Sequence, residues 1–184
     1  MALLLGAVTD AGAQKATDQY DETFRKYSKR FFGPGFDWRL FKAQAMAESR
    51  LDPSAASGVG ARGLMQLMPA TFREIQSKNP EFSSIDDPVF NIAAGICYDR
   101  KLWNLWSEPL DHERVRFVLG SYNAGRGTVL KARSLAEQRQ LDAGVWQSIR
   151  VVAPDVPRWR HGETLGYVDR IEANLQWLCT AAPR

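Results

Sequence analysis

The chain has 184 residues, the length of one domain, and 45% of them are hydrophobic and 11% aromatic, which excludes an intrinsically disordered protein. A net charge of +3 fits an anionic partner such as a cell wall, a membrane surface or nucleic acid without selecting among them. The Lys and Arg residues form no basic run, so no nucleic-acid partner is expected.

The amino-terminal stretch, residues 1–15, is expected to precede the folded domain, which we place at residues 16–184. Residues 2–8 are apolar and residues 11–13 resemble a small-residue cleavage site, but no basic residue precedes the apolar run. A degenerate signal segment and a plain tail both fit this stretch. No part of the chain is long enough to span a bilayer, so no membrane span is expected.

Two helices are predicted first. Residues 17–32 carry an aromatic stripe at helical spacing, which is typical of core packing, and Gly-Pro-Gly at 33–35 ends the helix. Asp37 can cap the second helix, which ends at Asp52-Pro53. One face of this second helix is apolar up to its last turn, where a carboxylate stands; its residues are Trp38, Phe41, Ala45 and Glu48.

The rest of the chain, after these two helices, predicts a mostly α-helical domain with little strand. Residues 54–62 form a loop by composition, and the apolar residues 64–68 are predicted to be strand or turn. Pro69 and Pro88 suit the first positions of new helices. Helices are predicted at 69–76, 88 to 103 or 106, 111–122 with Asp111 as the cap, 127–139 and 163–178, with residues 141–162 irregular because of Pro154 and Pro157.

The chain has two cysteines, Cys97 and Cys179, which are too far apart for a Cys-x-x-Cys motif. With two histidines in the whole chain, a Cys/His zinc site is not expected. Two buried free thiols are the simpler interpretation, and a disulfide is the alternative if the protein is exported. We therefore expect no metal.

Glu48 is the candidate for chemistry. A carboxylate on a buried helix face loses hydration, so its acid form is favoured and its pKa rises. Such a group can be protonated near neutral pH and act as a general acid. The alternative is that Glu48 simply ends its helix at the surface or pairs with Arg50 or Arg62.

The sequence around Glu48 resembles the soluble lytic transglycosylases of glycoside hydrolase family 23, which also holds goose-type lysozymes. The resemblance rests on four motifs in order and covers roughly residues 24–178. They are Glu48-Ser49 followed by residues 57–71, which read SGVGARGLMQLMPAT; Asn91-Ile92 with Gly95 and Tyr98; Ser121-Tyr122-Asn123-Ala124-Gly125; and Glu163-Thr164 with Tyr167-Val168. Ser121 departs from the family pattern, which usually has Ala there, and could add one hydrogen bond in the cleft wall.

The resemblance implies a single lysozyme-like α+β domain, mostly α, with a small strand and loop region near the cleft. It also implies cleavage of the peptidoglycan β-1,4 bond between N-acetylmuramic acid and N-acetylglucosamine, without a cofactor. Glu48 would protonate the glycosidic oxygen, and its ionised form would then take the proton from the muramic 6-hydroxyl to close a 1,6-anhydro ring. One carboxylate thus serves as acid and then as base, unlike the paired carboxylates of most glycosidases.

The resemblance also assigns substrate-binding roles. Ser57 is expected to hydrogen-bond near the N-acetyl group, and Tyr167 to orient Glu48 or the sugar. Glu163 is expected either to contact substrate or to make a structural hydrogen bond, and Ser49 either to hold the loop or to touch substrate. The other expected contacts are Met65 and Gln66 on the cleft floor and Tyr122 and Asn123 in its wall. For Gly58, Gly60 and Gly63, turn geometry alone is expected.

Two other functions fit the same sequence. A hydrolytic lysozyme of this fold would need a carboxylate that activates water, and Asp52, Asp86 and Asp87 are the nearest acids in sequence. A wall-binding protein with an inactive cleft is the second, against which the intact Glu48 argues. The expected partner is the glycan strand of peptidoglycan, the expected location is the periplasm or cell wall, and a monomer is expected. Phage lysis, wall remodelling and wall opening for a secretion machine would share these motifs.

Overall fold

The computed structural model describes residues 18–107 and 111–181. The elements are α2 (Asp21–Phe32), α3 (Arg39–Ser49), α4 (Pro69–Gln76), α5 (Pro88–Leu105), α6 (Asp111–Ala124), α7 (Arg126–Gln138), α8 (Trp146–Val152), the 3-10 turn η1 (Ala153–Asp155) and α9 (His161–Ala181). Within these described residues, β-structure is limited to two isolated bridges, Ala56–Arg62 and Arg62–Leu67. The prediction of a mostly helical domain is confirmed, whereas the expected small strand region is reduced to these bridges. The segment 1–15 lies outside the described residues.

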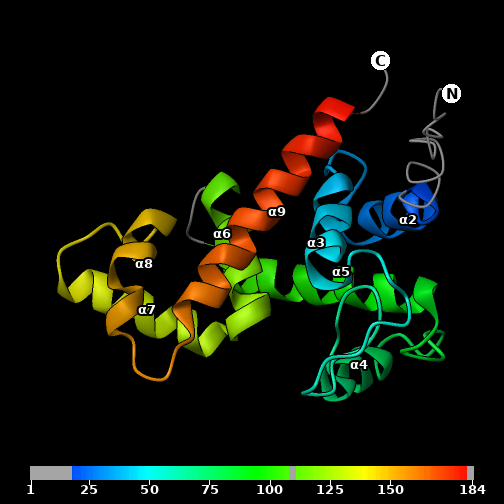
Figure 1. Cartoon of the computed structure of the whole chain (residues 1–184), viewed down its shortest axis with the longest axis horizontal. Coiled ribbons are helices and arrows are strands. Elements are labelled where there is room, and N and C mark those ends of the chain that lie inside the picture. The colour runs from blue at the N-terminus through cyan, green and yellow to red at the C-terminus, as the bar shows by residue number, and fades with distance from the viewer. Residues whose placement is uncertain (1–17, 108–110, 182–184) are drawn as a thin grey trace, which may run out of the picture.

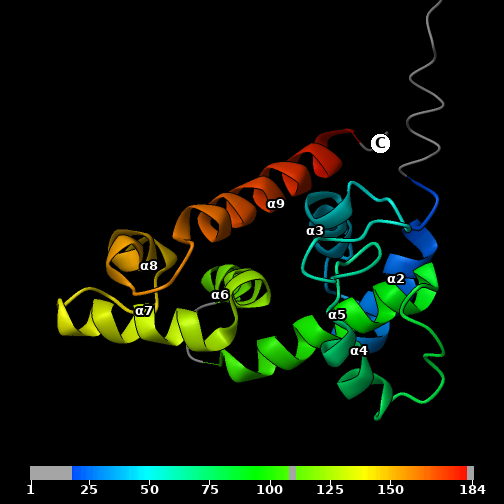
Figure 2. The same cartoon turned by 60° about the horizontal axis from the view of Figure 1, so that its bottom comes forward.

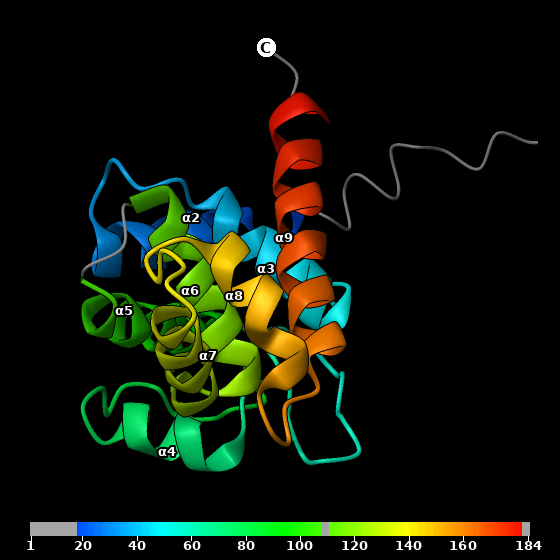
Figure 3. The same cartoon turned by 90° about the vertical axis from the view of Figure 1, so that its left-hand side faces the viewer.

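Helix α3 packs most extensively against α9. Helix α9 crosses both α3 and α6 (Figure 1). Turning the molecule shows α3 and α6 lying between α9 on one side and the long helix α5 on the other (Figure 2). Helix α4 packs on α5, well away from the carboxyl end of α9 (Figure 3). This arrangement places the last turn of α3 between α9 and the loop that follows α3.

Two hydrophobic clusters hold the fold. One joins α2, the first half of α5, α4 and the loop 64–67, with Phe24, Phe82 and Ile92 fully buried. The other joins α6, α7, α8 and α9 around Phe117 and Ile149. Because α3 and α5 contribute to both clusters, the two halves of the domain are fixed relative to each other through these helices.

Local signals place several helix ends. Pro69 and Pro88 occupy first positions of α4 and α5, as predicted, and the Asp87 side chain accepts hydrogen bonds from the backbone of Val89 and Phe90. The Asp37 carboxylate accepts a hydrogen bond from the backbone N–H of Arg39, 3.0 Å away. The predicted cap of α6, Asp111, lies outside the described side chains.

The prediction that residues 141–162 are irregular is wrong. They contain α8 and η1, because Trp146, Ile149 and Val152 recur at helical spacing and are all buried. Pro154 lies inside the 3-10 turn that follows and does not break α8.

The two cysteines are free thiols. Cys97 is partly buried, but Cys179 is exposed on α9, so the expectation that both are buried is wrong for Cys179. In the part of the chain that the structure describes, no cluster of three or more His, Cys, Asp and Glu side chains could hold a metal ion. No described helix combines the length and apolar character needed to cross a membrane.

Candidate active site

Glu48 stands in the last turn of α3, and its side chain is partly buried. The Tyr167 hydroxyl on α9 donates a hydrogen bond to Glu48 Oε1 at 2.6 Å, across 119 positions of sequence. Tyr167 itself is only 2% exposed, so its ring is held in the core and its hydroxyl is fixed in direction. The packing of α3 on α9 therefore positions this carboxyl group.

Burial raises the pKa of Glu48 from 4.5 to about 7. Two groups of α9 oppose this rise, the Tyr167 hydroxyl through its hydrogen bond and the Arg170 guanidinium through its charge. The balance leaves the carboxyl protonated in about half of the molecules near neutral pH, so it can deliver a proton and take one back. The alternative of an ion pair with Arg62 is wrong, since Arg62 pairs with Asp86 at 2.7 Å.

The loop after α3 is held in place by its own polar groups. The Ser49 hydroxyl donates to the Leu64 carbonyl at 2.9 Å, so Ser49 holds the loop. The Ser57 hydroxyl accepts a hydrogen bond from the backbone N–H of Ala61 at 2.9 Å. The Ser57 side chain is partly buried, and its hydroxyl hydrogen remains available for a further acceptor.

Met65 and Gln66 support the loop from within. The Met65 side chain is fully buried, its N–H donates to Asn91 Oδ1 at 2.8 Å, and its carbonyl accepts from the Tyr122 hydroxyl at 2.8 Å. The Gln66 side-chain amide donates to the carbonyls of Ala55 and Gly63. The structure therefore leaves the Gln66 side-chain oxygen, and not its N–H groups, for any ligand.

Two glycines are required by close packing. Gly63 has a φ of +76°, and a Cβ there would overlap the Asn91 side chain. A Cβ on Gly95 would come within 2.7 Å of Met65 Cγ. The expectation of turn geometry alone is therefore incomplete for Gly63, whereas Gly60 has a φ of +91° with open space around it.

The end of α6 is tied to the start of α9. The Thr164 hydroxyl donates to Asn123 Oδ1 at 2.8 Å, and the indole N–H of Trp159 donates to Thr164 Oγ1 at 3.0 Å. Asn123 is exposed. Glu163 is also exposed and pairs with Arg160 at 3.2 Å.

Each of the three candidate water-activating acids has a local structural partner. Asp52 is exposed, and hydrogen bonds from Ser54 hold its pKa below the usual range. Asp86 forms the ion pair with Arg62, and Asp87 caps α5. Each of these three carboxylates is therefore already bound to a group of a loop or of a helix end.

A family model described as the transglycosylase SLT domain matches residues 23–147. The chain belongs to this family. The SLT domain is 33% identical over 165 residues to membrane-bound lytic murein transglycosylase F of Shewanella sediminis, in a match that covers 83% of this chain and 32% of that protein. The chain thus spans about a third of the length of this curated relative.

Solved structures support the same assignment. The SLT domain is similar to the 70 kDa soluble lytic transglycosylase SLT70 of Escherichia coli, with a TM-score of 0.64 and 28% identity over 86% of this chain and 24% of that one. It is also similar to an inactive glutamate-to-glutamine mutant of lytic transglycosylase Slt of Pseudomonas aeruginosa, with a TM-score of 0.68 and 26% identity over 91% of this chain and 25% of that one. The lysozyme-like SLT fold predicted from the motifs is confirmed.

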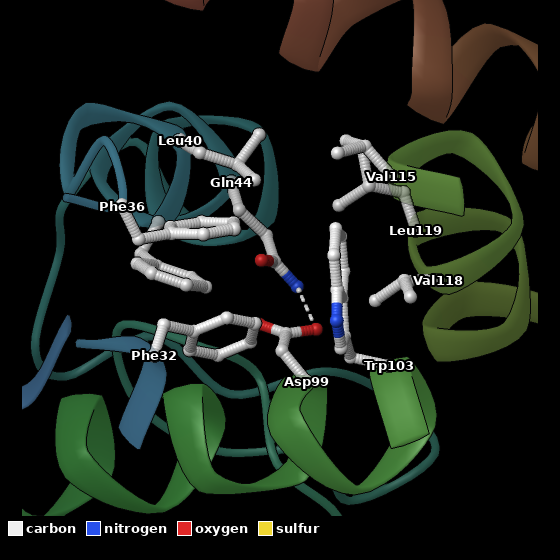
Figure 4. Close-up of a pocket in the computed structure, with 10 residues that line it drawn as sticks. Phe32, Phe36, Leu40, Gln44, Asp99, Trp103, Val115, Val118 and Leu119 are labelled. Carbon is white, nitrogen blue, oxygen red and sulfur yellow. Dashed lines mark hydrogen bonds between the residues drawn. The ribbon is translucent and has the colours of Figure 1, made fainter. Parts of the chain in front are cut away.

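Asp99 is a second buried acid in this SLT domain that the motifs do not reveal. Its side chain is 1% exposed, and Gln44 Nε2 donates to Asp99 Oδ1 at 3.4 Å. Figure 4 shows the two side chains meeting between Phe32 and Phe36 on one side and Trp103 on the other. Burial is the main reason that the pKa of Asp99 lies well above its ordinary value. The signal was present in the sequence, because Asp99 continues the stripe of Ile92 and Ile96 on α5.

Ser121 also has a role different from the expected one. Its side chain is fully buried, and Ser121 Oγ accepts a hydrogen bond from the indole N–H of Trp106 at 2.9 Å. The predicted extra hydrogen bond therefore exists, but it lies in the core between α5 and α6 and not in a cleft wall.

Proposed function

We propose that this SLT domain is a peptidoglycan lytic transglycosylase that cleaves the β-1,4 bond between N-acetylmuramic acid and N-acetylglucosamine and leaves 1,6-anhydromuramic ends. The observation that carries the proposal is Glu48, a partly buried carboxyl group with a pKa of about 7 and a fixed hydroxyl partner. The family and the lytic transglycosylases among its relatives support the substrate class. The inactive Pseudomonas Slt mutant supports a mechanism that depends on one glutamate.

In the first step, the protonated Glu48 donates its proton to the glycosidic oxygen, and the bond to the muramic anomeric carbon breaks. The N-acetyl group of the muramic acid assists by stabilising the positive charge at that carbon. The ionised Glu48 then accepts the proton of the muramic 6-hydroxyl, whose oxygen closes the anhydro ring. Atoms balance without water, and Glu48 returns to its starting form.

The Tyr167 hydroxyl suits both steps. It holds Glu48 Oε1 in place while Oε2 exchanges the proton, and it stabilises the carboxylate between the two steps. The Ser57 hydroxyl, the Gln66 side-chain oxygen, Asn123 and Glu163 are proposed to contact the sugars. Tyr122 and the buried Met65 shape the floor from beneath, because they bind each other and hold the backbone of the loop.

The proposed setting is the periplasm or the cell wall, with the glycan strand as the partner and a monomer as the active form. The relatives include membrane-bound and soluble lytic transglycosylases, which supports a role at peptidoglycan. No metal or cofactor takes part in the proposed steps.

Mass spectrometry of the fragments released from purified peptidoglycan tests the proposal. Products with 1,6-anhydromuramic ends are one water lighter than hydrolysis products and would support it. Reducing muramic ends would instead indicate a lysozyme, and variants of Asp52, Asp86 and Asp87 would then be needed to find the water-activating group. Sacculi that bind the protein but release no soluble fragment would overturn both activities.

A further inference from the structure

A polar hollow of about 250 Å³ lies where the end of α6 meets the start of α9. Figure 1 shows the start of α9 beside the junction of α6 and α7. The lining includes Asn123, Thr128, Arg158, Arg160, Glu163 and Thr164. Nothing in the proposed bond cleavage uses the arginines of this hollow.

The lining of the hollow lies within one helical turn of Tyr167, which binds the proposed catalytic carboxyl group. Thr164, in its lining, and Tyr167, which binds Glu48, are three residues apart on α9 and thus project from the same side of the helix. One turn of an α-helix rises roughly 5 Å. A substituent of a sugar bound beside Glu48 can therefore reach the hollow while the sugar stays in the cleft.

The hollow carries one uncompensated positive charge. Arg160 pairs with Glu163 at 3.2 Å, so these two charges offset each other. Arg158 is exposed, and no carboxylate among the described residues pairs with it. An arginine fork in a polar hollow is suited to bind a carboxylate through two parallel hydrogen bonds.

The backbone at Arg158 has an uncommon conformation and lies between buried residues. Its φ is +62°, in the left-handed region that residues other than glycine rarely adopt. It stands between Val156 and Trp159, which are 4% and 9% exposed. The indole N–H of Trp159 is bound to Thr164, so the segment is tied to α9 directly beside Arg158.

We propose that this hollow binds the carboxylates of the peptide stem that is attached to muramic acid, with Arg158 as the determinant of stem recognition. The proposal rests on the proposed substrate, peptidoglycan. The sugar rings of this polymer carry hydroxyl and N-acetyl groups but no charge, because the lactyl carboxyl of muramic acid is consumed in the amide bond to the stem. The carboxylates of the polymer are thus on the peptide, and they complement Arg158.

The test compares two substrates that differ only in the stems. Purified peptidoglycan with intact stems is digested in parallel with the same glycan after an amidase has removed the stems and the lactyl carboxyl groups that it frees have been capped as neutral amides. Arg158→Gln, which keeps a polar side chain but removes the charge, is expected to lower kcat/KM on intact peptidoglycan about tenfold, mainly through KM, since tenfold corresponds to the loss of one charged hydrogen-bonding contact. Activity on the stem-free glycan is expected to stay unchanged.

Two variants control for charge and geometry. Lys26→Ala removes one positive charge from the exposed side of α2, which is distant from the start of α9, and is expected to leave the preference for intact stems unchanged. Arg158→Lys keeps the charge but loses the planar fork, so it is expected to restore part of the lost preference. Equal losses on both substrates with Arg158→Gln, or no loss on either, would overturn the proposal.

A binding measurement separates this proposal from the proposed catalysis. Binding of Glu48→Gln to immobilised peptidoglycan fragments with intact stems, and to immobilised stem-free glycan strands, reports recognition without turnover. Stem-dependent binding that disappears in the Glu48→Gln, Arg158→Gln double variant would support the hollow even if the parent protein released no anhydromuramic products. Binding that does not depend on the stems would refute it even if the parent were an active transglycosylase.

Discussion

Glu48 and Asp99 are two carboxyl groups on apolar helix stripes with different surroundings. Burial raises the pKa of both. Glu48 reaches a partly exposed position, where a hydroxyl and a guanidinium of α9 oppose the rise and leave the pKa at about 7. Asp99 lies fully inside the core, where its one described hydrogen bond, from Gln44, is 3.4 Å long, and its pKa stays well above the ordinary value.

The comparison shows that burial alone does not make a useful acid. For a carboxyl group buried with little compensation, as Asp99 is, burial disfavours the charged form and moves the pKa well above its ordinary value. One that also gains a fixed donor and a nearby cation remains able to ionise. The geometry of α9, which supplies both groups to Glu48, is therefore what separates a proton-transfer site from a buried polar residue.

Glu48→Gln gives the largest expected effect. The amide keeps the shape of the side chain and can still accept the Tyr167 hydrogen bond, but it has no proton to donate. We expect release of anhydromuramic fragments to fall by about 10³-fold, as for the loss of a general acid–base group. Circular dichroism and thermal unfolding would check that the fold is kept. A variant that released fragments at the parent rate would contradict the assignment of Glu48.

The pH dependence of the parent follows from the pKa of Glu48. The reaction starts from the protonated carboxyl group, so the rate is expected to fall as pH rises through about 7, approaching tenfold per pH unit above that. Initial rates of fragment release between about pH 5 and about pH 9 would locate the alkaline limb of the pH–rate profile, which is the range where the rate falls as pH rises. A limb near 4.5, the ordinary value for glutamate, would mean that burial does not control the acid.

Tyr167→Phe separates the effect of the Tyr167 hydrogen bond on the pKa of Glu48 from the effect of burial. The Tyr167 hydrogen bond lowers the pKa of Glu48, so its loss is expected to move the alkaline limb to higher pH. The maximal rate is expected to fall about tenfold, since the carboxylate formed between the two steps loses a donor worth roughly 1.4 kcal/mol. Tyr122→Phe is the matched control, because its hydroxyl binds the Met65 carbonyl and should leave the limb in place. Limbs that moved together in both variants would contradict a specific role for Tyr167.

Asp99→Asn tests the other half of the comparison through stability. The folded-state pKa of Asp99 is raised, so the parent has its full stability below the unfolded-state pKa and loses it as pH rises toward the folded-state value. Asparagine does not ionise, so we expect the variant to become more stable than the parent by up to about 1.4 kcal/mol per pH unit above about pH 4. Urea unfolding at several pH values measures the difference. Asp169→Asn, an exposed aspartate paired with Arg150, is the control and should show little change. A gain that did not depend on pH would contradict a raised folded-state pKa of Asp99.

Sequence alone predicted the parts of this molecule that carry local signals. Proline at first helical positions located the starts of α4 and α5, and an acid at the end of an apolar stripe identified Glu48. Asp99 and the buried residues of α8 follow the same helical spacing, but Asp99 lies outside the four motifs and Pro154 favoured an irregular segment. The Glu48–Tyr167 bond could not be read from either segment, because it depends on how α3 packs on α9 across 119 positions. Only the resemblance to a family brought those two residues together beforehand.

Ser121→Ala is the smallest expected effect and completes the comparison with a buried pair that carries no charge. Removing the hydroxyl leaves the indole N–H of Trp106, in a side chain only 1% exposed, without its acceptor. An unsatisfied buried donor costs about 1 to 3 kcal/mol, and we expect a loss near the lower end of that range. Neither the Ser121 hydroxyl nor the Trp106 indole N–H titrates between about pH 5 and about pH 8. The loss of stability should therefore be the same at both pH values, unlike the gain from Asp99→Asn. Ser134→Ala, at an exposed serine on α7, is the control and should cost little stability. A pH-dependent loss of stability in Ser121→Ala would mean that the Ser121–Trp106 pair is coupled to the ionisation of Glu48 or Asp99.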